Sequence, residues 1–339
     1  MIKKIILFLS MLFISSLTLF SQDQNLYSTA EKGESLNIPG LYAKMETSKG
    51  SIIFYLDYKN TPLTSMNFIK LAEQGFYNGL KFYRDIENYA IFSGDPENNG
   101  SSDAGYNFPM EINSEILHDG SGILSMDGVS GLSNSSRFFI SKSSDSVLDG
   151  KYTAFGFITE GKKVLDKLKR GESILSIEVI HTGSDALAFK YDEIEFARIS
   201  KKIMDEELEA FRSENPEVVS AIETLGEGVQ KTLTGIYYKT TLPGNGVGPK
   251  AEDMVSVHYT AMLVDGTVFD SSYSRETPFE FTVGTKSVIS GWDESVMNMT
   301  IGEKRTVIIP PSLAYGDTQT GPIPPGSWLM FEIEFLGIK

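Results

Sequence analysis

The stretch VSVHYTAMLVDGTVFDSS, residues 255–272, decides the fold of the C-terminal part of the chain. Apolar residues alternate with more polar ones along its first half, at the period of two that is typical of a half-buried strand. The dipeptide DG then supplies a common hairpin turn. We therefore expect two antiparallel strands, of which the first carries Tyr259 and the second carries Phe269 and Asp270.

A short helix is expected after this hairpin, in VISGWDESVMNM, residues 288–299. Ile289 and Trp292 fall on one helical face, which would point the indole ring toward the sheet. Ser290 and Asp293 have the spacing of a capping box, with Ser290 as the residue that caps the helix. The pattern predicts one short helix packed against the sheet.

The last part of the chain combines a loop with a closing strand. PPSLAYGDTQTGPIPPGS, residues 310–327, is dense in Pro and Gly and has Tyr315 near its start. WLMFEIEFLGI, residues 328–338, alternates apolar and polar residues and reads as a strand. The sheet, the helix and the loop are expected to form a cup lined by aromatic side chains.

These segments resemble the FKBP-type peptidyl-prolyl isomerases. The pieces HYTAML, DGTVFDSS, PFEFTVG, VISGW, AYG and IPP occur in the order of that family, and we assign the domain to residues 230–339. The resemblance implies a curved antiparallel sheet that wraps one short helix. It implies catalytic positions at Tyr259, Asp270, Ile289, Trp292 and Tyr315, and substrate-binding positions at Phe269, Arg275, Phe279, Val288, Ile323 and Phe331.

The composition argues against several classes of function. The chain has 30 Lys and Arg against 45 Asp and Glu, a formal net charge of -15, and no cysteine. Such an acidic chain lacks the basic surface that nucleic acid and anionic lipid require. Cysteine-ligated zinc and thiolate chemistry are excluded, and the three histidines have no ligand-like spacing. We expect no metal and no cofactor, whereas polypeptide partners are compatible with this composition.

The N-terminus has the pattern of a secretory signal peptide. MIKKIILFLSMLFISSLTLFSQ has two early lysines, an apolar run interrupted by serines, and Ser21 as a small residue for cleavage. The alternative is an uncleaved membrane anchor, because the run approaches the ~20 residues needed to span a bilayer. We expect residues 1–21 to be removed and residues 22–40 to form a flexible leader. The mature chain would then be exported to a bacterial periplasm without stable membrane insertion.

Residues 41–183 have the pattern of a closed antiparallel sheet with two helices. LYAKMET and SIIFYL flank a turn, and further strand signals occur at KFYRDI, YAIFSGD, GILSM, RFFIS, YTAFGFI and SIEVIHTG. Helical spacing appears in PLTSMNFIKLAEQG, residues 62–75, and helical signals appear in GKKVLDKLKRG, residues 161–171. This order predicts a β-barrel whose ends are covered by helices.

The same segment resembles the cyclophilin family of isomerases. The pieces TPLTSMNFIKLAEQGFYNGLKFYR, SGDP, FPMEI, GILSMD, SSRFFIS and LDGKYTAFGFITEG carry the resemblance. It implies a catalytic arginine at Arg84, the floor of a proline pocket at Phe139 and a pocket wall at Leu148. Considered alone, Arg84 could equally pair with Asp85 or Glu87 at the surface. The other substrate-binding positions would be Tyr89, Phe92, Arg137 and Tyr152.

Several of these positions depart from the cyclophilin pattern. Phe92 and Arg137 stand where the family has glutamine, and Tyr152 stands where it has histidine. Asp127 and Gly128 replace an Ala-Asn pair. We therefore expect a pocket that admits proline but turns it over slowly, because aligned hydrogen-bond partners are lost.

Residues 184–229 are expected to form a helical connector. Asn215 and Pro216 are residue types that begin a second helix. The apolar stripe of the first helix is expected to dock on one of the domains, and the alternative is an arm that binds clients or a second copy of the chain. The stripe consists of Phe196, Ile199, Ile203, Met204, Leu208 and Phe211.

The two resemblances together predict a peptidyl-prolyl cis-trans isomerase that assists the folding of exported proteins. Rotation about an X-Pro bond has a barrier of roughly 18–20 kcal/mol, which an apolar cup and well-placed donors can lower. The FKBP-like domain is expected to be the main catalyst. Expected partners are unfolded or proline-containing polypeptides, with macrolide-type inhibitors at the FKBP-like pocket. The alternative is a holdase, or a module that binds proline segments with little turnover.

Overall fold

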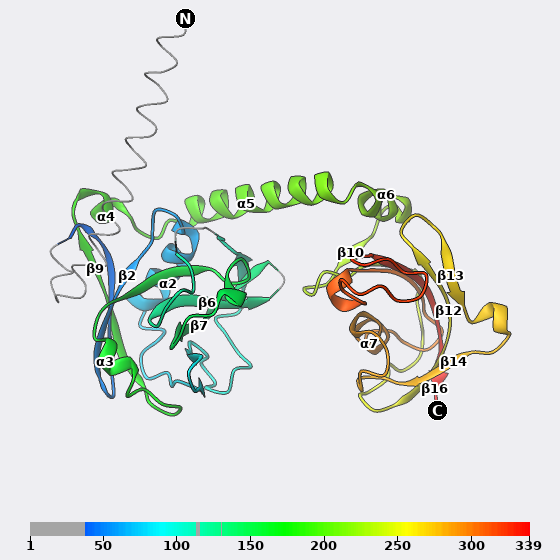
Figure 1. Ribbon diagram of the computed structural model, residues 1–339, viewed down its shortest axis with the longest axis horizontal. Coiled ribbons are helices and arrows are strands. Elements are labelled where there is room, and N and C mark those ends of the chain that lie inside the picture. The colour runs from blue at the N-terminus through cyan, green and yellow to red at the C-terminus, as the bar shows by residue number, and fades with distance from the viewer. Residues whose placement is uncertain (1–37, 113–115, 130) are drawn as a thin grey trace, which may run out of the picture. The chain divides into compact units, whose positions relative to one another are not determined.

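The structure, a computed structural model, describes residues 38–112, 116–129 and 131–339, and it divides into two compact units (Figure 1). The division falls between Glu206 and Glu207, within one helix. The predicted signal peptide and most of the predicted leader lie outside the described residues. In the part of the chain that is described, no helix has the length and apolar character needed to cross a membrane.

The first unit is a nine-stranded antiparallel sheet with strand order β3-β4-β7-β6-β8-β2-β1-β9, in which β5 pairs with β7. The Phe82 N–H donates to the Glu172 carbonyl at 2.8 Å, and the Gly171 N–H donates to the Phe82 carbonyl at 2.9 Å. These bonds join the two ends of the sheet and confirm the predicted barrel. Its elements are β1 (Gly40–Thr47), β2 (Gly50–Leu56), α2 (Pro62–Glu73), β3 (Arg84–Ile86), β4 (Ala90–Ser93), β5 (Asn107–Pro109), β6 (Ile123–Val129), β7 (Leu132–Ser141), the 3-10 helix η2 (Ser146–Leu148), β8 (Ala154–Glu160), α3 (Lys162–Leu165), β9 (Ile174–Thr182) and α4 (Ser184–Ala188).

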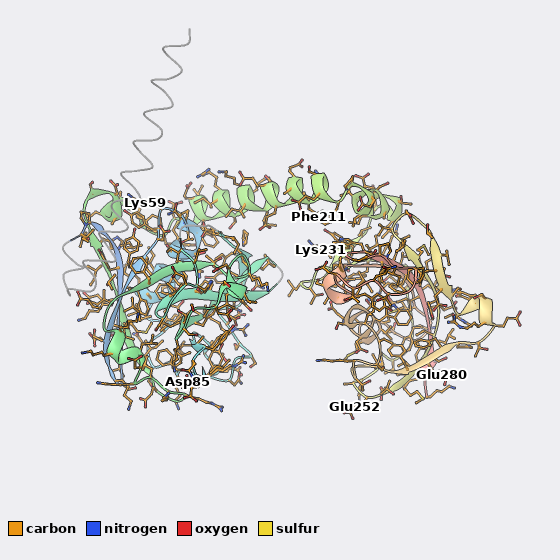
Figure 2. All side chains as sticks on the ribbon, viewed as in Figure 1. Lys59, Asp85, Phe211, Lys231, Glu252 and Glu280 are labelled. Atoms are coloured by element: carbon orange, nitrogen blue, oxygen red, sulfur yellow. The ribbon has the colours of Figure 1, made fainter. Side chains whose placement is uncertain are left out.

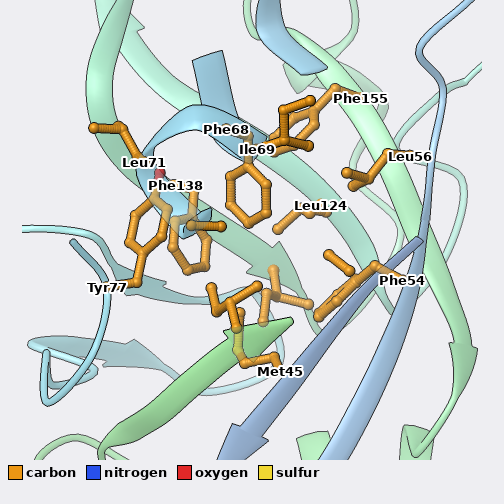
Figure 3. Packing of buried hydrophobic residues seen from close by; sticks show 14 of the residues in the cluster. Met45, Phe54, Leu56, Phe68, Ile69, Leu71, Tyr77, Leu124, Phe138 and Phe155 are labelled. Atoms are coloured by element: carbon orange, nitrogen blue, oxygen red, sulfur yellow. The ribbon is translucent and has the colours of Figure 1, made fainter. Parts of the chain in front are cut away.

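Helix α2 supplies aromatic and aliphatic side chains to the core of the first unit (Figure 3). Phe68 is fully buried, and its ring centroid lies 5.1 Å from that of Tyr77 and 5.3 Å from that of Phe155. Pro62 begins the helix, where a missing N–H costs nothing. Truncation of such a buried ring typically costs about 3–5 kcal/mol, so the barrel depends on this helix.

The second predicted helix of the barrel is shorter than the sequence pattern indicated. The sequence predicts a helix over residues 161–171, whereas α3 ends at Leu165. Leu168 is nevertheless fully buried. The chain leaves the helix early because it must return to the edge of the sheet, where Gly171 adopts a φ of +94° and bonds to Phe82.

The second unit is a seven-stranded sheet with strand order β10-β11-β15-β16-β12-β13, in which β14 pairs with β12. Figure 1 shows α7 inside the curve of this sheet, which confirms the predicted arrangement of a curved antiparallel sheet around one short helix. Its elements are α6 (Pro216–Leu225), β10 (Gln230–Lys231), β11 (Tyr237–Leu242), β12 (Met254–Leu263), β13 (Val268–Ser271), the 3-10 helix η3 (Tyr273–Arg275), β14 (Phe279–Thr282), α7 (Ser290–Met297), β15 (Lys304–Ile309), the 3-10 helix η4 (Pro311–Leu313) and β16 (Leu329–Ile338).

The predicted capping box of α7 does not form. The capping position is Ile289, and Ser290 is already the first helical residue. The Asp293 carboxylate instead accepts hydrogen bonds from the Gly284 N–H at 3.0 Å and the Lys286 N–H at 2.9 Å. Asp293 therefore holds the preceding loop against the helix, a role that the capping-box spacing does not indicate.

Helix α5 (Glu193–Glu214) places its apolar residues in different surroundings. Phe196, Ile199 and Ile203, near its start, pack against the core of the first unit. Phe211, labelled in Figure 2, packs against Tyr237 and Trp328 of the second unit at centroid distances of 6.1 and 5.7 Å. Met204 and Leu208 remain 55% and 45% exposed. Asn215 occupies the expected capping position just before α6, although its side chain donates to the Phe211 carbonyl rather than capping the helix.

Glu111 caps the start of α2 from the interior of the first unit. Its carboxylate accepts hydrogen bonds from the Leu63 N–H at 2.9 Å and from the Thr64 N–H and hydroxyl, both at 2.7 Å. Burial raises the pKa of Glu111 from 4.5 to about 7, although these hydrogen bonds oppose the shift. The folded chain therefore holds this proton more tightly than the unfolded chain does in that pH range.

We predict that α2 loses protection as the pH rises through about 7. The stabilising contribution of a carboxyl with a raised pKa is complete below the unfolded-state value and is lost above the folded-state value, here on the order of 3 kcal/mol. Hydrogen exchange of α2 amides, corrected for intrinsic exchange, should show this loss. Glu111→Gln should flatten the pH dependence, whereas Glu178→Gln, at an exposed position of β9, should leave it intact. An unaltered profile in Glu111→Gln would contradict the prediction.

Candidate active sites

A pocket of about 210 Å³ lies in the second unit. Trp292 of α7 is 4% exposed, and its ring meets those of Tyr259 and Phe331 nearly edge-on, at centroid distances of 5.0 and 5.4 Å. Such edge-to-face contacts fix the indole in one orientation. The second-unit pocket is lined by Tyr259, Ala261, Phe269, Asp270, Phe279, Ser287, Val288, Ile289, Trp292, Tyr315 and Phe331.

The pairing of β12 brings the walls of this pocket together. Ala261 is opposite Asp270 on β13 and opposite Phe331 on β16. Val257, further back on the same strand, is opposite Phe279 on β14. Because side chains alternate along a strand, one register sets which residues of all three neighbouring strands face the cavity.

An arginine, a carboxylate and a phenol form one network at the edge of the second-unit pocket. Both the Tyr259 hydroxyl and the Arg275 guanidinium donate to the Asp270 carboxylate, and Arg275 also donates to the Tyr259 oxygen at 2.8 Å. Desolvation opposes ionisation of Asp270, but the hydrogen bonds from Tyr259 and Arg275 outweigh it and lower the pKa of this carboxyl. Desolvation, together with the bond to Asp270, raises the pKa of Tyr259. Asp270 is therefore held as a charged acceptor.

Two hydrogen-bond donors of the second-unit pocket are not used by the described part of the chain. The Ile289 N–H, at the start of α7, and the Tyr315 hydroxyl donate to no residue there. Tyr315 is 39% exposed, so its hydroxyl can reach a bound molecule. The indole N–H of Trp292 is also unpartnered, but it is buried. An apolar cup with two free donors at its wall suits a ligand that presents an apolar ring and carbonyl oxygens.

The structure brings all the sequence-predicted residues of the second unit into the pocket lining except Arg275 and Ile323. Arg275 acts on the lining residues through its bonds to Asp270 and Tyr259. Ile323 is 4% exposed and packs in the core behind. Ala261 and Ser287 line the pocket but were not predicted; the alternation along β12 could have identified Ala261, whereas nothing in the local sequence singles out Ser287.

A larger pocket, of about 490 Å³, lies in the first unit. Phe139 of β7 is 2% exposed, and its ring lies 5.4 Å from both Phe92 and Tyr152, measured between centroids. These rings give the pocket an apolar floor. The first-unit pocket is lined by Tyr83, Arg84, Ile86, Tyr89, Phe92, Asn99, Gly100, Asp127, Phe139, Tyr152 and Arg170.

His118 supports Phe139. The imidazole stacks on the phenyl ring at a centroid distance of 5.9 Å and is 1% exposed. Its Nδ1 lies 2.9 Å from an Asp149 carboxylate oxygen, and its Nε2 lies 2.8 Å from the Ser125 hydroxyl oxygen. Both ring nitrogens are thus engaged, and the floor of the pocket cannot easily tilt. This role of His118 could not be predicted from local spacing, because Phe139 and Asp149 lie far from it along the chain.

Arg84 is exposed at the rim of the first-unit pocket. Its guanidinium carbon lies 5.2 Å from the centroid of the Phe92 ring, a cation–π arrangement. Asp85, labelled in Figure 2, is instead bound by Lys142 and by Lys169, the latter at 3.6 Å. Within the described residues Arg84 forms no ion pair, either with Asp85 or with Glu87, the two partners that the sequence offered as alternatives.

Arg137 is engaged within the protein. Its Nε donates to the Asp127 carboxylate at 3.0 Å, and its Nη1 donates to the Gly100 carbonyl at 2.7 Å. Neither Arg137 nor Leu148 is among the residues that line the pocket, although Leu148 packs against Phe139. In the part of the chain that is described, no group of three His, Asp or Glu side chains is arranged to hold a metal ion.

Comparison with known proteins gives a family for each unit. Residues 42–185 match the family described as "Cyclophilin type peptidyl-prolyl cis-trans isomerase/CLD", and residues 246–336 match "FKBP-type peptidyl-prolyl cis-trans isomerase". A crystal structure of a cyclophilin-type peptidyl-prolyl cis-trans isomerase from Cryptosporidium parvum is 28% identical, with a TM-score of 0.40; the similarity covers 42% of this chain and 98% of that one.

The relatives that are similar to the second unit include two FK506-binding proteins. FK506-binding protein 1A of Aspergillus fumigatus is 48% identical over 107 residues, which are 31% of this chain and 96% of that protein. FK506-binding protein 2 of Podospora anserina is 53% identical over 91 residues, which are 26% of this chain and 49% of that protein, so the chain spans about half of its length. The chain therefore belongs to the peptidyl-prolyl cis-trans isomerases and joins a cyclophilin-type domain to an FKBP-type domain.

Proposed function

We propose that the FKBP-type domain is the main catalyst and that the chain assists the folding of exported polypeptides. The observation that carries this proposal is the aromatic cup over Trp292 with two unused donors, the Ile289 N–H and the Tyr315 hydroxyl.

We propose domain limits of 41–183 for the cyclophilin-type domain and 230–339 for the FKBP-type domain, with the helical connector over residues 184–229.

In the second-unit pocket the prolyl ring would rest on Trp292, between the rings of Tyr259 and Phe331. Rotation about the X-Pro bond breaks the conjugation between the carbonyl group and the prolyl nitrogen. The Ile289 N–H and the Tyr315 hydroxyl would bind the substrate carbonyls and hold the twisted amide. Because the cup is apolar, these hydrogen bonds are stronger than they would be in water.

Asp270 would act on the rotating carbonyl by charge rather than by proton transfer. Its carboxylate is fixed by Tyr259 and Arg275 and keeps a lowered pKa, so it stays ionised at neutral pH. In the planar amide the oxygen is partly negative and the nitrogen is partly positive. A fixed negative charge therefore destabilises the planar form only when it faces the oxygen. No covalent intermediate is needed.

In the first-unit pocket Arg84 would donate to the prolyl nitrogen while the ring rests on Phe139. Localising the nitrogen lone pair lowers the double-bond character of the amide, which lowers the rotational barrier. The engagement of Arg137 by Asp127 and Gly100, and the presence of Phe92 in place of an amide, leave fewer donors for the substrate backbone. We therefore propose slower turnover at this site, or binding with little turnover.

We also propose that the chain is exported to a bacterial periplasm and that the second-unit pocket binds macrolide-type inhibitors. The proposal of export rests on the order of features in residues 1–22, which are two early lysines, an apolar run and then the small residue Ser21, and on the lack of cysteine. Inhibitor binding rests on the names of the relatives, which state FK506 binding, and on the aromatic lining of the pocket.

We predict that the double substitution Asp270→Val, Tyr315→Phe removes most of the turnover of X-Pro peptides by the full chain. Loss of an aligned donor and of a fixed charge commonly costs ~1–3 kcal/mol, or roughly a ten- to hundred-fold fall in kcat/KM. A protease-coupled isomerisation assay measures it. Tyr273→Phe, which alters an exposed tyrosine outside the pocket, is the matched control. Full turnover in the folded double variant would refute the assignment of the main catalytic site.

We predict that the activity remaining in this double variant depends on Arg84. Arg84→Ala should abolish the residual turnover without unfolding the barrel, because the side chain is exposed and forms no ion pair with the described residues. Lys151→Ala, at another exposed position of the barrel, should leave it unchanged. Residual turnover that is indifferent to Arg84→Ala would contradict the proposed mechanism, and prolonged peptide binding without turnover would favour the holdase alternative.

We predict that protein isolated from its native host begins at Gln22 or a near neighbour, because Ser21 precedes it at the end of the apolar run. Intact-mass analysis of the soluble exported fraction measures this end. Recovery of the chain with Met1, in membranes, would support the anchor alternative instead.

A further inference from the structure

Two cationic side chains lie at the first-unit pocket. Arg84 and Arg170 both line it, both are exposed, and neither forms an ion pair with any residue that the structure describes. The closure of the barrel explains why they meet, since the hydrogen bond from the Gly171 N–H to the Phe82 carbonyl joins the two strand ends next to them. The hydrogen bond between these two strand ends therefore places two positive charges in the lining of one cavity.

Two carboxylates near these arginines, Asp127 in the lining and Asp85 beside Arg84 in the sequence, are already paired. Asp127, which lines the pocket, is bound by Arg137 at 3.0 Å. Asp85, next to Arg84 in sequence, is bound by Lys142 and Lys169. Although the chain as a whole has a net charge of -15, this cavity therefore offers two positive charges that are free to bind a ligand. Clefts lined by one sign of charge concentrate ligands of the opposite sign.

We infer that the first-unit pocket selects polypeptide segments in which an acidic residue stands next to the proline. The inference rests on the proposed binding of the prolyl ring at Phe139. The carboxylate of a residue next to the proline would lie near Arg170, while Arg84 donates to the prolyl nitrogen. The selectivity is electrostatic, so it should be modest and should weaken as salt is added.

The test uses the full chain with the substitutions Asp270→Val and Tyr315→Phe, so that the second site contributes little. Turnover is compared for three peptides that carry Glu, Ala or Lys before proline, and for a second set with the same residues after proline. Activity of the first site is defined as the part of the turnover that Arg84→Ala removes. We expect kcat/KM for one of the Glu peptides to exceed that for its Ala counterpart by roughly two- to five-fold at low salt, with Lys the poorest.

Arg170→Gln should bring the Glu-to-Ala ratio close to one. Lys167→Gln removes the same charge at an exposed position that does not line the pocket and should keep the ratio of the parent. A ratio near one in the parent at low salt, or a preference that survives Arg170→Gln, would overturn the inference while leaving the site an isomerase. Absence of any Arg84-dependent turnover would instead refute the function proposed for this site, and the inference with it.

Discussion

The register of β12 is the constraint on which the main site depends. This strand pairs with β13, β14 and β16, so that Ala261 faces Asp270 on one side and Phe331 on the other. A slip of one residue would turn Tyr259 to the opposite face of the sheet and separate it from Trp292. The aromatic cup and the charged network at its edge therefore arise from one set of backbone hydrogen bonds.

The barrel of the first unit obeys a different constraint, which is closure. A closed sheet has no free edge, so segments that are far apart in sequence must meet at the seam. Here the seam runs between Phe82 and Gly171, and the residues on either side of it, Arg84 and Arg170, reach the same cavity. The chemistry of this pocket thus follows from topology as well as from the side chains that line it.

The sequence predicts the site residues whose positions follow from the periodicity of one strand or helix. It does not predict which partner a polar side chain binds when that partner lies on another element. The alternation in β12 and the position of Trp292 could be predicted because side-chain direction repeats along a strand or helix. The engagement of Arg137 by Asp127 could not, because the partners lie on different strands and the same residue types would suit a free donor. Asp293 shows the same limit: its spacing suggested a cap, but its hydrogen bonds go to the loop before the helix.

Both tryptophans of the chain lie in the second unit and report on different parts of it. Trp292 lies in the ligand pocket, whereas Trp328 packs with Phe211 and Tyr237 in a separate cluster against α6. Fluorescence excited selectively in tryptophan therefore carries no direct signal from the barrel. Tryptophan emission of the natural chain therefore follows the FKBP-type domain alone. Far-ultraviolet circular dichroism follows both domains, so comparison of the two signals separates the unfolding of the FKBP-type domain from that of the cyclophilin-type domain.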